Sequence, residues 1–474
     1  MTAALARLLT DALQRAGSPV ESTADAAQTP QDLLSIGERV AQQLAAQRVR
    51  PAEPVHVRIG NRPSDLGALL GIWNAGAVAV PLHVSAAPAT VASLLRATGA
   101  RLLVDGDRIE AIGDAPPAER PLLQDAALVI FTSGSTGLPK GVVIGHQRLA
   151  DKIAVLDRLL QFNSRDTVLV PLQLTFIFGM WVCLLALRAG AKPTLVPRFS
   201  IEALSSGLAR GATILAGVPS MYRALLADAS FRMPGLRQIL TGGEVLPKPL
   251  ALAMQRAAPD AALYDLYGLT ETGSCDFVVG PADQADGLGT IGATTEGVSF
   301  RIATAEGREA APGGGGELCV RTPYGMLGYL DNPQLTAQSF HDGYFNTGDL
   351  ARVGPGGRVQ LIGRSKDIVS RGGMKIAPLE IDNLLAEHPG VVAALCAGVP
   401  DERLGECIHA VIVPRAGAHL TAEALRTWML ERTEKFKVPD AFHFAQALPA
   451  GPTGKADRRG VARLIGEVRA AKGP

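Results

Sequence analysis

The sequence predicts an α/β protein with a large N-terminal domain of α/β sheets that includes a small antiparallel, barrel-like part, followed by a small C-terminal α+β domain. From Val55 onward, apolar strands alternate with helical stretches, as in the crossover units of an α/β sheet. Between Ala303 and Val320 the pattern changes to short strands around glycines, which is typical of antiparallel hairpins. Past Asp367, strand and helix segments return, which indicates a second domain.

The first elements are expected to be helices. Residues 1–17 carry apolar side chains at helical spacing. A second helix should begin after Thr29, because Thr29 is a good N-cap, proline follows it, and Asp32 lies in the first turn. The next expected elements are a strand, a helix and an apolar strand that ends at a proline, at Val55–Ile59, Leu66–Ala75 and Ala77–Pro81.

The later elements are expected to be hairpins and then mixed segments. The glycines of Gly313–Gly316 and Gly354–Gly357 are expected to form hairpin turns. Pro378–Glu387 is expected to be helical and Val391–Val399 extended. We place the domain boundary after Arg364, which gives domains of residues 1–364 and 365–474.

Composition excludes several classes of protein. The chain has 474 residues, of which 47% are hydrophobic and 19% charged, so it can bury a large core and is neither disordered nor fibrous. The net charge of +1 gives no support for nucleic acid or an anionic membrane as the main partner.

The cysteines and the N-terminus favour the cytoplasm. The five cysteines are scattered and never form a C-x-x-C pair, so neither a disulfide framework nor a zinc site is indicated. Charged residues interrupt the N-terminal apolar residues, so these lack the core of a secretory signal. No apolar run reaches the length of about 18 residues that a spanning helix needs.

A loop rich in hydroxyls and glycines follows an apolar run. Leu128–Phe131 reads as a buried strand, and the loop that leaves it ends in Lys140. Glycines let backbone N–H groups approach an anion, hydroxyls donate to phosphate oxygens and lysine adds positive charge, so the loop suits a polyphosphate. The loop residues are Thr132, Ser133, Gly134, Ser135, Thr136 and Gly137. It is not a Walker P-loop, because Pro139 and Gly141 flank the lysine; a flexible Ser/Gly linker is the alternative.

Four further segments follow this loop in a fixed order. They are Leu266–Thr272 (LYGLTET), Asn346–Asp349 (NTGD), Gly363–Asp367 (GRSKD) and Gly451–Lys455 (GPTGK). Together with the loop they resemble the adenylate-forming enzymes, which include acyl-CoA and aryl-CoA synthetases, adenylation domains of nonribosomal peptide synthetases and beetle luciferases. The resemblance runs from about Val55 to Arg458. In character it is closest to stand-alone acyl- or aryl-CoA ligases.

The resemblance implies an enzyme that activates a carboxylic acid with Mg·ATP, giving an acyl-adenylate and pyrophosphate, and passes the acyl group to a thiol. A carboxylate that attacks the α-phosphate brings two anions together, so charge must be neutralised and the geometry held in line. By resemblance, loop residues 132–137 and Lys140 hold the β- and γ-phosphates, and Thr270 contacts the α-phosphate. Glu271 and Thr136 are the expected Mg²⁺ ligands, and oxygen is what this cation prefers.

The adenosine moiety has its own expected site. By resemblance, adenine and ribose are bound by Gly243, Glu244, Asp265, Tyr267, Asp349 and Arg364. Asp265 stands where asparagine is common in the family, and a carboxylate still accepts a hydrogen bond from the adenine amino group.

The resemblance assigns Lys455 the central catalytic role. A lysine between the attacking carboxylate and the α-phosphate stabilises charge at both, and losing such a contact costs roughly 10²- to 10³-fold in rate. A solvated tail lysine is the alternative. The C-terminal domain is expected to be mobile, rotating at the hinge residue Lys366 so that Gly372 and Gly373 leave a narrow passage for pantetheine. An ordinary hairpin turn is the alternative for these glycines.

The segment Leu172–Trp181 is expected to contribute to the acid pocket. Phe176 stands where the family often has a gating aromatic, frequently histidine, and Ile177 stands where amino-acid-activating members have aspartate. Because a buried ammonium without a partner costs several kcal/mol, an α-amino acid is not expected. Apolar side chains favour an aromatic acid or a short to medium aliphatic one, and plain core is their alternative role. Gly242 and Gly268 complete the expected pocket.

The expected acceptor is CoA, since no carrier domain follows Lys455. A separate acyl-carrier protein with a phosphopantetheine arm is the alternative within the family. A luciferase-like oxidase and a non-catalytic nucleotide-binding regulator are alternatives from other classes. Lys140, Glu271 and Lys455 together argue against the regulator, because ATP binding alone does not need a lysine at the α-phosphate.

Overall fold

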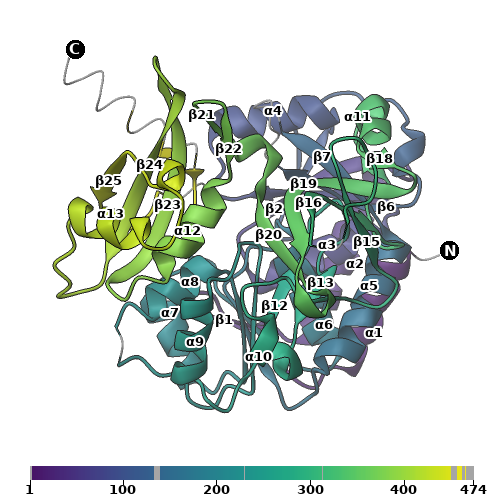
Figure 1. Cartoon of the computed structure of the whole chain (residues 1–474). Coiled ribbons are helices and arrows are strands. Elements are labelled where there is room, and N and C mark those ends of the chain that lie inside the picture. Colours follow the sequence, from purple (N-terminus) through teal and green to yellow (C-terminus); the bar gives the residue numbers. More distant parts are fainter. Residues whose placement is uncertain are drawn as a thin grey trace.

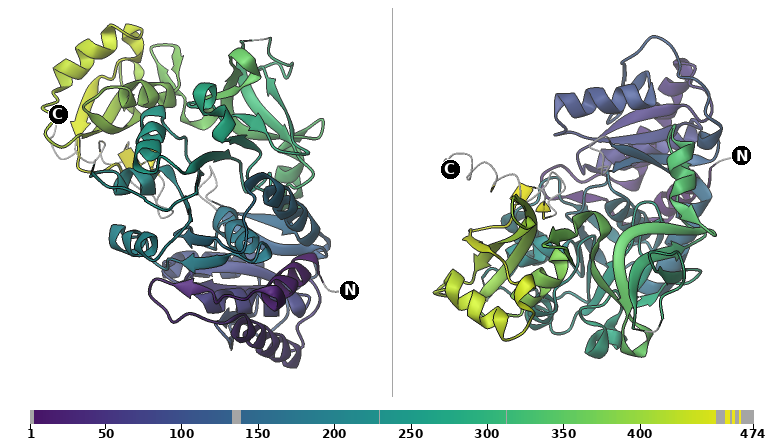
Figure 2. Two further views of the ribbon diagram at one scale, coloured as in Figure 1. Left: turned by 90° about the horizontal axis from the view of Figure 1, so that it is seen from below. Right: turned by 45° about the horizontal axis from the view of Figure 1, so that its top comes forward.

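The computed structural model describes residues 3–132, 139–228, 230–311, 313–449, 456–458, 460–461 and 465. Four β-sheets and the helices around them form a large N-terminal part and a small C-terminal part (Figure 1). In both views of Figure 2 the yellow C-terminal part stands apart from the purple N-terminal elements. None of the described helices is long and apolar enough to cross a membrane.

The first sheet has seven strands. They are β2 Pro54–Ile59, β3 Val78–His83, β4 Leu102–Asp105, β5 Arg108–Ala111, β6 Ala126–Thr132, β7 Lys140–Gly145 and β17 Gly328–Tyr329, in the spatial order β17-β7-β6-β3-β2-β4-β5. The four central strands are parallel, while β5, β7 and β17 pair antiparallel. The strand that was expected to end at Pro81 continues to His83. Proline has no backbone N–H to donate to a neighbouring strand, but β3 pairs with β6 only at Ala79↔Leu128, so the pairing of these two strands hardly requires one.

The second sheet has eight strands. They are β1 Glu21–Ser22, β8 Thr167–Val170, β9 Lys192–Leu195, β10 Ile214–Gly217, β11 Gln238–Gly242, β12 Ala262–Tyr267, β13 Phe277–Val279 and β14 Ala293–Thr294, in the order β1-β9-β8-β10-β11-β12-β13-β14. The strands from β1 to β12 are parallel, and β13 and β14 add an antiparallel edge. The parallel strands therefore end at one shared edge, where ligands bind in open α/β sheets.

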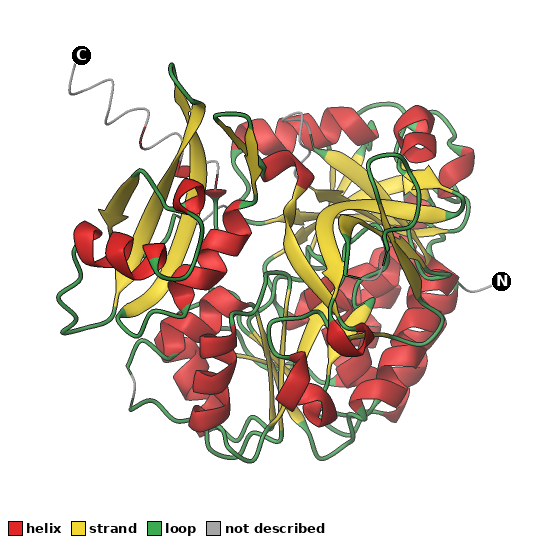
Figure 3. Ribbon diagram, viewed as in Figure 1, coloured by secondary structure: helices red, strands yellow, loops and turns green. Residues whose placement is uncertain are grey.

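Helices fill the layers between and outside these sheets (Figure 3). The layer between the sheets holds α1 Ala4–Arg15, α2 Pro30–Ala46, α3 Pro63–Asn74, α5 His146–Leu160 and α6 Ile177–Arg188. Leu9 of α1 shares one buried core with Val57 of the first sheet and Val168 of the second, which defines this middle layer. The outer faces carry α4 Pro88–Thr98 on the first sheet, and α7 Ile201–Ala209, α8 Pro219–Leu225 and α9 Lys248–Ala257 on the second.

The capping residues decide where the early helices begin. Thr29 accepts from the backbone N–H of Asp32, and Asp32 accepts from that of Thr29, so the expected start of α2 is confirmed. The next helix, α3, begins at Pro63 rather than at Leu66. Its first turn forms earlier because Asp65 accepts from the backbone N–H groups of Gly60 and Arg62.

The third sheet is antiparallel and lies between the large sheets and the C-terminal part in sequence. Its strands are β15 Ser299–Ala303, β16 Gly315–Arg321, β18 Phe340–His341, β19 Tyr344–Val353 and β20 Val359–Arg364, and two short helices, α10 Gln284–Gly287 and α11 Pro333–Gln338, flank them. Their order is β15-β16-β19-β18, with β20 also paired to β19. The turn expected at Gly313–Gly316 lies partly within β16, whereas the turn at Gly354–Gly357 joins β19 to β20 as expected.

The C-terminal part has a sheet and core of its own. After a short 3-10 helix at Ser365–Asp367 come β21 Val369–Arg371, β22 Met374–Ile376, α12 Pro378–Ala386, β23 Val391–Asp401, β24 Gly405–Pro414, α13 Ala422–Leu430 and β25 Ala441–Phe444. The order is β22-β21-β24-β23, with β25 parallel to β24. The expected helix and strand are both present, and α12 and α13 pack on this sheet through a separate buried cluster.

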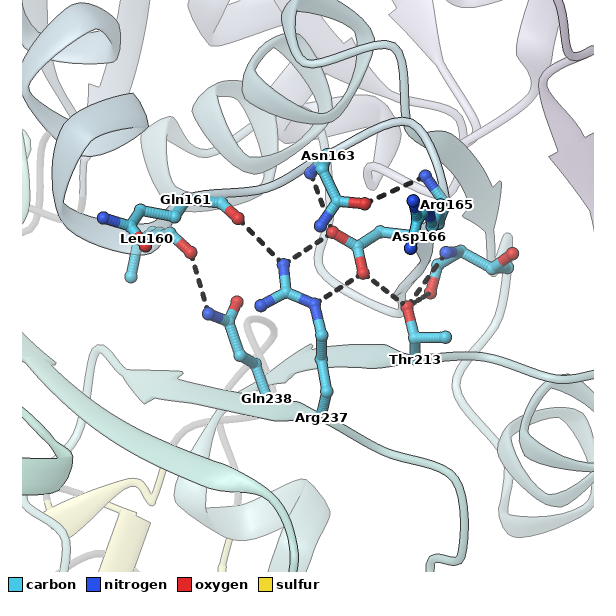
Figure 4. Close-up of polar contacts among 9 residues, drawn as sticks. Leu160, Gln161, Asn163, Arg165, Asp166, Thr213, Arg237 and Gln238 are labelled. Carbon is cyan, nitrogen blue, oxygen red and sulfur yellow. Dashed lines mark hydrogen bonds and ion pairs between the residues drawn. The ribbon is translucent and has the colours of Figure 1, made fainter.

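A buried ion pair fixes the amino-terminal ends of the second sheet (Figure 4). Asp166, 2% exposed, accepts from Arg237 at 2.7 and 2.6 Å and from the Thr213 hydroxyl at 2.9 Å. Burial opposes ionisation of Asp166, but the hydrogen bonds from Arg237 and Asn163 lower its pKa below the ordinary value. These contacts join the ends of β8, β10 and β11 opposite to the edge that carries the predicted site.

Candidate active site

The predicted phosphate loop connects two paired strands. It leaves β6 at Thr132 and enters β7 at Lys140, and these two residues are directly opposite each other in the antiparallel ladder. The predicted site residues Ser133, Gly134, Ser135, Thr136 and Gly137 lie outside the described residues. Lys140 is therefore fixed at the first position of β7, with its ammonium 5.4 Å from the ring centre of Tyr329.

The loop from β12 to β13 carries Thr270 and Glu271. Its close packing requires glycine at two points: a Cβ on Gly268 would lie 2.3 Å from the backbone nitrogen of Cys275, and one on Gly273 would lie 2.4 Å from the carbonyl oxygen of Tyr324. Three successive residues, Gly273–Cys275, have positive φ. Such a tight, left-handed path persists only where surrounding contacts hold it.

Those contacts come from α5 and α6 beneath the loop. Lys152, 0% exposed, donates to the carbonyl of Cys275 at 2.6 Å and to the hydroxyl of Thr295 at 3.1 Å. Trp181 donates its indole N–H to the Ser274 hydroxyl at 3.2 Å. Burial raises the pKa of Asp276 to about 6, although the nearby Lys152 ammonium and the Thr272 hydroxyl lower it.

Glu271 is held from the other side by β17. Tyr329 donates its hydroxyl to Oε1 of Glu271 at 3.1 Å, and the backbone N–H of Met326 donates to the Glu271 carbonyl at 2.8 Å. No hydrogen bond joins the other carboxylate oxygen, Oε2, to a side chain in the described ranges. Glu271 thus keeps an oxygen available for a cation.

Three predicted nucleotide-binding residues form one cluster. Asp349 and Arg364 face each other across β19 and β20, with Nε of Arg364 2.7 Å from Oδ1 of Asp349. Tyr267, at the end of β12, donates its hydroxyl to Oδ2 at 2.7 Å. Asp349 is 3% exposed, and a carboxylate offers about four lone-pair sites, so it can still accept from the hydroxyls of a ribose.

The ends of β11 and β12 bring together the predicted adenine and acid residues. Gly242, the last residue of β11, pairs with Leu266, and Thr241 pairs with Asp265; Gly268 directly follows the end of β12. Glu244 accepts from the Ser220 hydroxyl at 3.2 Å, and Gly243 has a φ of 80°. Burial raises the pKa of Asp265 to about 8, partly offset by a backbone hydrogen bond from Leu266. The Asp265 side chain is therefore mainly neutral at pH 7.

The predicted acid residues on α6 differ in their surroundings. Phe176 is the N-cap residue of α6 and partly exposed, while Ile177 is buried in the core between the two large sheets. Phe178, also partly exposed, stacks on Trp181 with ring centres 5.3 Å apart. Ile177 is therefore a core residue, which is the alternative role given above, whereas Phe176 and Phe178 are partly exposed at the start of the helix.

The predicted hinge and thiol residues lie in the C-terminal part. Lys366 is in the 3-10 helix that follows β20, and Gly372 and Gly373 form the exposed turn between β21 and β22, with φ values of 55° and 84°. Lys455 lies outside the described residues. Arg458 forms ion pairs with Asp382 at 2.6 Å and Asp367 at 3.8 Å, which connect this residue to α12 and to the 3-10 helix that contains Lys366.

Three residues around the candidate site were not identified from the sequence. Lys152 follows Leu149 on the apolar stripe of α5, a position from which a buried lysine could have been predicted. Tyr329 and Arg223 carry no such signal, since β17 is only two residues long and α8 seven. Arg223 is half-buried, and none of the described residues accepts a hydrogen bond from it; burial lowers its pKa, with nearby Glu244 opposing.

Comparison with known proteins identifies the family. Residues 20–119 and 105–330 match the family described as AMP-binding enzyme, and residues 380–455 match its AMP-binding enzyme C-terminal domain. A feruloyl-CoA synthase of an Amycolatopsis species is 34% identical over 459 residues, covering 91% of each chain. The fatty acid–[acyl-carrier-protein] ligase ScoC of Streptomyces coeruleorubidus is 30% identical, covering 89% of this chain and 88% of its own.

A solved structure agrees with this assignment. The crystal structure of ATP-bound MatB from Rhodopseudomonas palustris superposes with a TM-score of 0.85 and 25% identity, covering 98% of this chain and 99% of that one. The match covers both parts of the fold. The chain therefore belongs to the AMP-binding enzyme family, as one of its adenylate-forming acyl-CoA ligases.

Proposed function

We propose that this ligase activates an aromatic or short to medium aliphatic carboxylic acid with Mg·ATP and transfers the acyl group to CoA. One observation carries the proposal: Tyr329 and Lys140 of the first sheet and Asp349 and Arg364 of the third sheet meet the Tyr267–Glu271 segment at the carboxyl end of β12 in the second sheet. The carboxyl end of parallel strands is where an open α/β sheet binds its ligand. Acid and nucleotide would meet there.

The proposed roles follow the charge that develops in adenylation. Lys140 and the loop residues 132–137 would bind the β- and γ-phosphates, and Thr270 the α-phosphate. Lys455 would stabilise charge on the attacking carboxylate and the α-phosphate. Holding both reactants in line is the larger part of such catalysis, since the chemistry itself needs no covalent enzyme intermediate.

The residues fit a bound Mg²⁺ ion. Glu271 offers a carboxylate oxygen that no described side chain occupies, and Mg²⁺ is commonly bound through one or two carboxylates together with substrate phosphates. Groups of three or more acidic, histidine or cysteine side chains that could hold a metal are absent from the described residues, in keeping with a site that the nucleotide completes. The ion would neutralise phosphate charge. Thr136 is the second proposed ligand.

The acid class rests on the surroundings of α6. Phe176 and Phe178 offer apolar surface at the start of α6, and Gly242 and Gly268 are the further proposed pocket residues at the ends of β11 and β12. Arg223 supports a second candidate, an acid that carries a further anionic group, because its half-buried guanidinium has no hydrogen-bond acceptor among the described residues. Arg223→Leu should remove activity toward such acids and leave apolar acids unaffected.

The acceptor and the hinge form one proposal. We place CoA first, and an acyl-carrier protein with the same phosphopantetheine arm second, as the relative ScoC is named for such a carrier. Residues 365–474 would rotate at Lys366 to bring the Gly372–Gly373 turn to the thiol path. Gly373→Trp should then slow thioester formation from a supplied acyl-adenylate while adenylation continues; equal rates would remove the thiol path from this turn. We place the protein in the cytoplasm, where both ATP and CoA are available.

Acid-dependent pyrophosphate release is the test of this function. It should be screened over benzoates, cinnamates, C2 to C12 fatty acids, malonate and amino acids, with and without CoA. Release with an apolar acid, and its stimulation by CoA, is the expected result. If no acid gives pyrophosphate release with either thiol acceptor, although the protein binds ATP, the ligase proposal would be wrong and a nucleotide-binding regulator would take its place.

A further inference from the structure

Tyr329 occupies a rigid position between two functional segments. Its strand, β17, pairs with β7, with Tyr329 opposite Val142, and the residue is 4% exposed. Its backbone N–H donates to the Thr336 hydroxyl at 2.9 Å. The ring is therefore fixed by a strand pair and a side-chain hydrogen bond and has little freedom to turn away.

Two contacts connect this ring to opposite charges. The hydroxyl donates to the Glu271 carboxylate at 3.1 Å, and the Lys140 ammonium lies 5.4 Å from the ring centre, within the range of a cation–π interaction. The side-chain hydrogen bond of Glu271 and the cation–π contact of Lys140 in the described part of the chain are both with Tyr329, and no ion pair joins the two residues there. Tyr329 thus lies between an anion and a cation that would otherwise be natural partners.

We infer that Tyr329 is a positioning residue that orients the Glu271 carboxylate for a divalent cation and keeps it from pairing with the Lys140 ammonium. The inference rests on the proposed roles of Glu271 and Lys140. A direct ion pair would neutralise both groups and occupy the oxygen that a cation needs. A neutral hydroxyl orients the carboxylate through a charge-assisted hydrogen bond and leaves its charge intact.

The chemistry of the tyrosine suits this role. A tyrosine hydroxyl has one proton to donate and is uncharged, so it can hold the Glu271 carboxylate by a hydrogen bond without neutralising it. Hydrogen bonds that orient a metal-binding group are worth about 10- to 100-fold in metal affinity or activity.

The surrounding backbone shows that this contact is part of a larger frame. Arg148 of α5 donates to the carbonyls of Gly325 and Met326 at 2.9 and 2.6 Å. Leu327 and Leu330 donate to β7 carbonyls at 2.8 Å. The segment 325–330 is thereby attached both to β7, which carries Lys140, and to the backbone of Glu271, so Tyr329 need not hold the loop in place.

Tyr329→Phe removes the hydroxyl and keeps the ring beside Lys140. We expect about 10-fold weaker Mn²⁺ binding, followed by electron paramagnetic resonance in the presence of a non-hydrolysable ATP analogue. In acid-dependent ATP–pyrophosphate exchange we expect a similar rise in the Mg²⁺ concentration for half-maximal rate, with the KM for the acid unchanged. Tyr329→Leu, which also removes the ring, should in addition raise the KM for ATP.

Tyr344→Phe is the matched control. Tyr344 also lies beside cationic side chains, those of Arg301 and Arg321, but its surroundings are outside the proposed site. Its loss of a hydroxyl should leave Mn²⁺ binding unchanged. Melting temperatures of the variants, compared with that of the wild type, separate positioning from unfolding.

The outcomes distinguish this inference from the proposed function. Unchanged Mn²⁺ binding and Mg²⁺ dependence in a folded Tyr329→Phe protein would overturn the inference, even if the wild type is an active ligase. Weaker Mn²⁺ binding in that variant, with no exchange by the wild type for any acid, would support the inference and overturn the ligase. A variant that is unfolded at the assay temperature would make Tyr329 structural, which also overturns the inference.

Discussion

Replacing Asp265 with asparagine tests the proposed role of this residue in adenine binding. A neutral carboxyl has one donor and one acceptor, the same pair with which asparagine binds N6 and N7 of adenine. Because burial raises the pKa of Asp265 to about 8, the carboxyl is about 90% protonated at pH 7 and about 10% protonated at pH 9. The ionised carboxylate still accepts from the adenine amino group but can no longer donate to N7, so the Kd for ATP should rise by at most about tenfold between these pH values.

The Asp265→Asn protein should lack this pH dependence, because an amide does not titrate. The assay is ATP binding by calorimetry at pH 7, 8 and 9, with the variant and the wild type in the same buffers so that titration of ATP itself cancels. Asp260→Asn, at an exposed position shortly before β12, is the matched control and should show the same change of the Kd for ATP with pH as the wild type. Equal slopes for Asp265→Asn and the wild type would show that the protonation state of Asp265 plays no part in adenine recognition.

The same pKa also makes a prediction about stability. The folded protein binds a proton at Asp265 more tightly than the unfolded chain, whose aspartate pKa is about 3.9. The stabilisation relative to Asp265→Asn is therefore fully present below about pH 4 and lost as the pH rises through about 8. Urea unfolding of both proteins across this range measures the difference.

Three further substitutions test the frame of the site. Lys152→Met should remove the buried ammonium from the Cys275 carbonyl, which then keeps only the Thr295 hydroxyl as a donor, and cost about 1–3 kcal/mol in the free energy of unfolding. The exchange rate should fall as well; urea titration and ATP–pyrophosphate exchange measure the two effects. Gly268→Ala should lower the exchange rate about 10²-fold, because its Cβ would displace the loop that carries Thr270; an unchanged kcat would contradict the tight packing. Arg237→Ala should cost about 1–3 kcal/mol in the free energy of unfolding, because the buried Asp166 loses its ion pair but keeps the hydrogen bonds from Thr213 and the Asn163 backbone. The KM for ATP should stay the same, since this ion pair lies at the opposite ends of the strands.

Local signals predicted most of the fold, and non-local contacts account for the differences. The start of α2 followed from the Thr29 capping residues, which lie within one turn of each other. The start of α3 differed because Asp65 caps the chain from a position inside the expected loop. Of the site, the motif order predicted the Asp349–Arg364–Tyr267 cluster as nucleotide ligands, but not that they contact one another. Tyr329 could not be found, since its contact with Glu271 spans 58 residues and leaves no periodic trace.

The two carboxylates at this edge differ in a way that matches their proposed ligands. A tyrosine hydroxyl orients each one: Tyr267 donates to Asp349 and Tyr329 donates to Glu271. Arg364 also pairs with Asp349, which largely cancels its charge, whereas no described cation pairs with Glu271. A carboxylate that is paired with an arginine suits the uncharged hydroxyls of a ribose, because its charge is already compensated when no ligand is bound. A carboxylate that is oriented but retains its charge suits a divalent cation, so the placement of one arginine would distinguish the proposed sugar site from the proposed metal site.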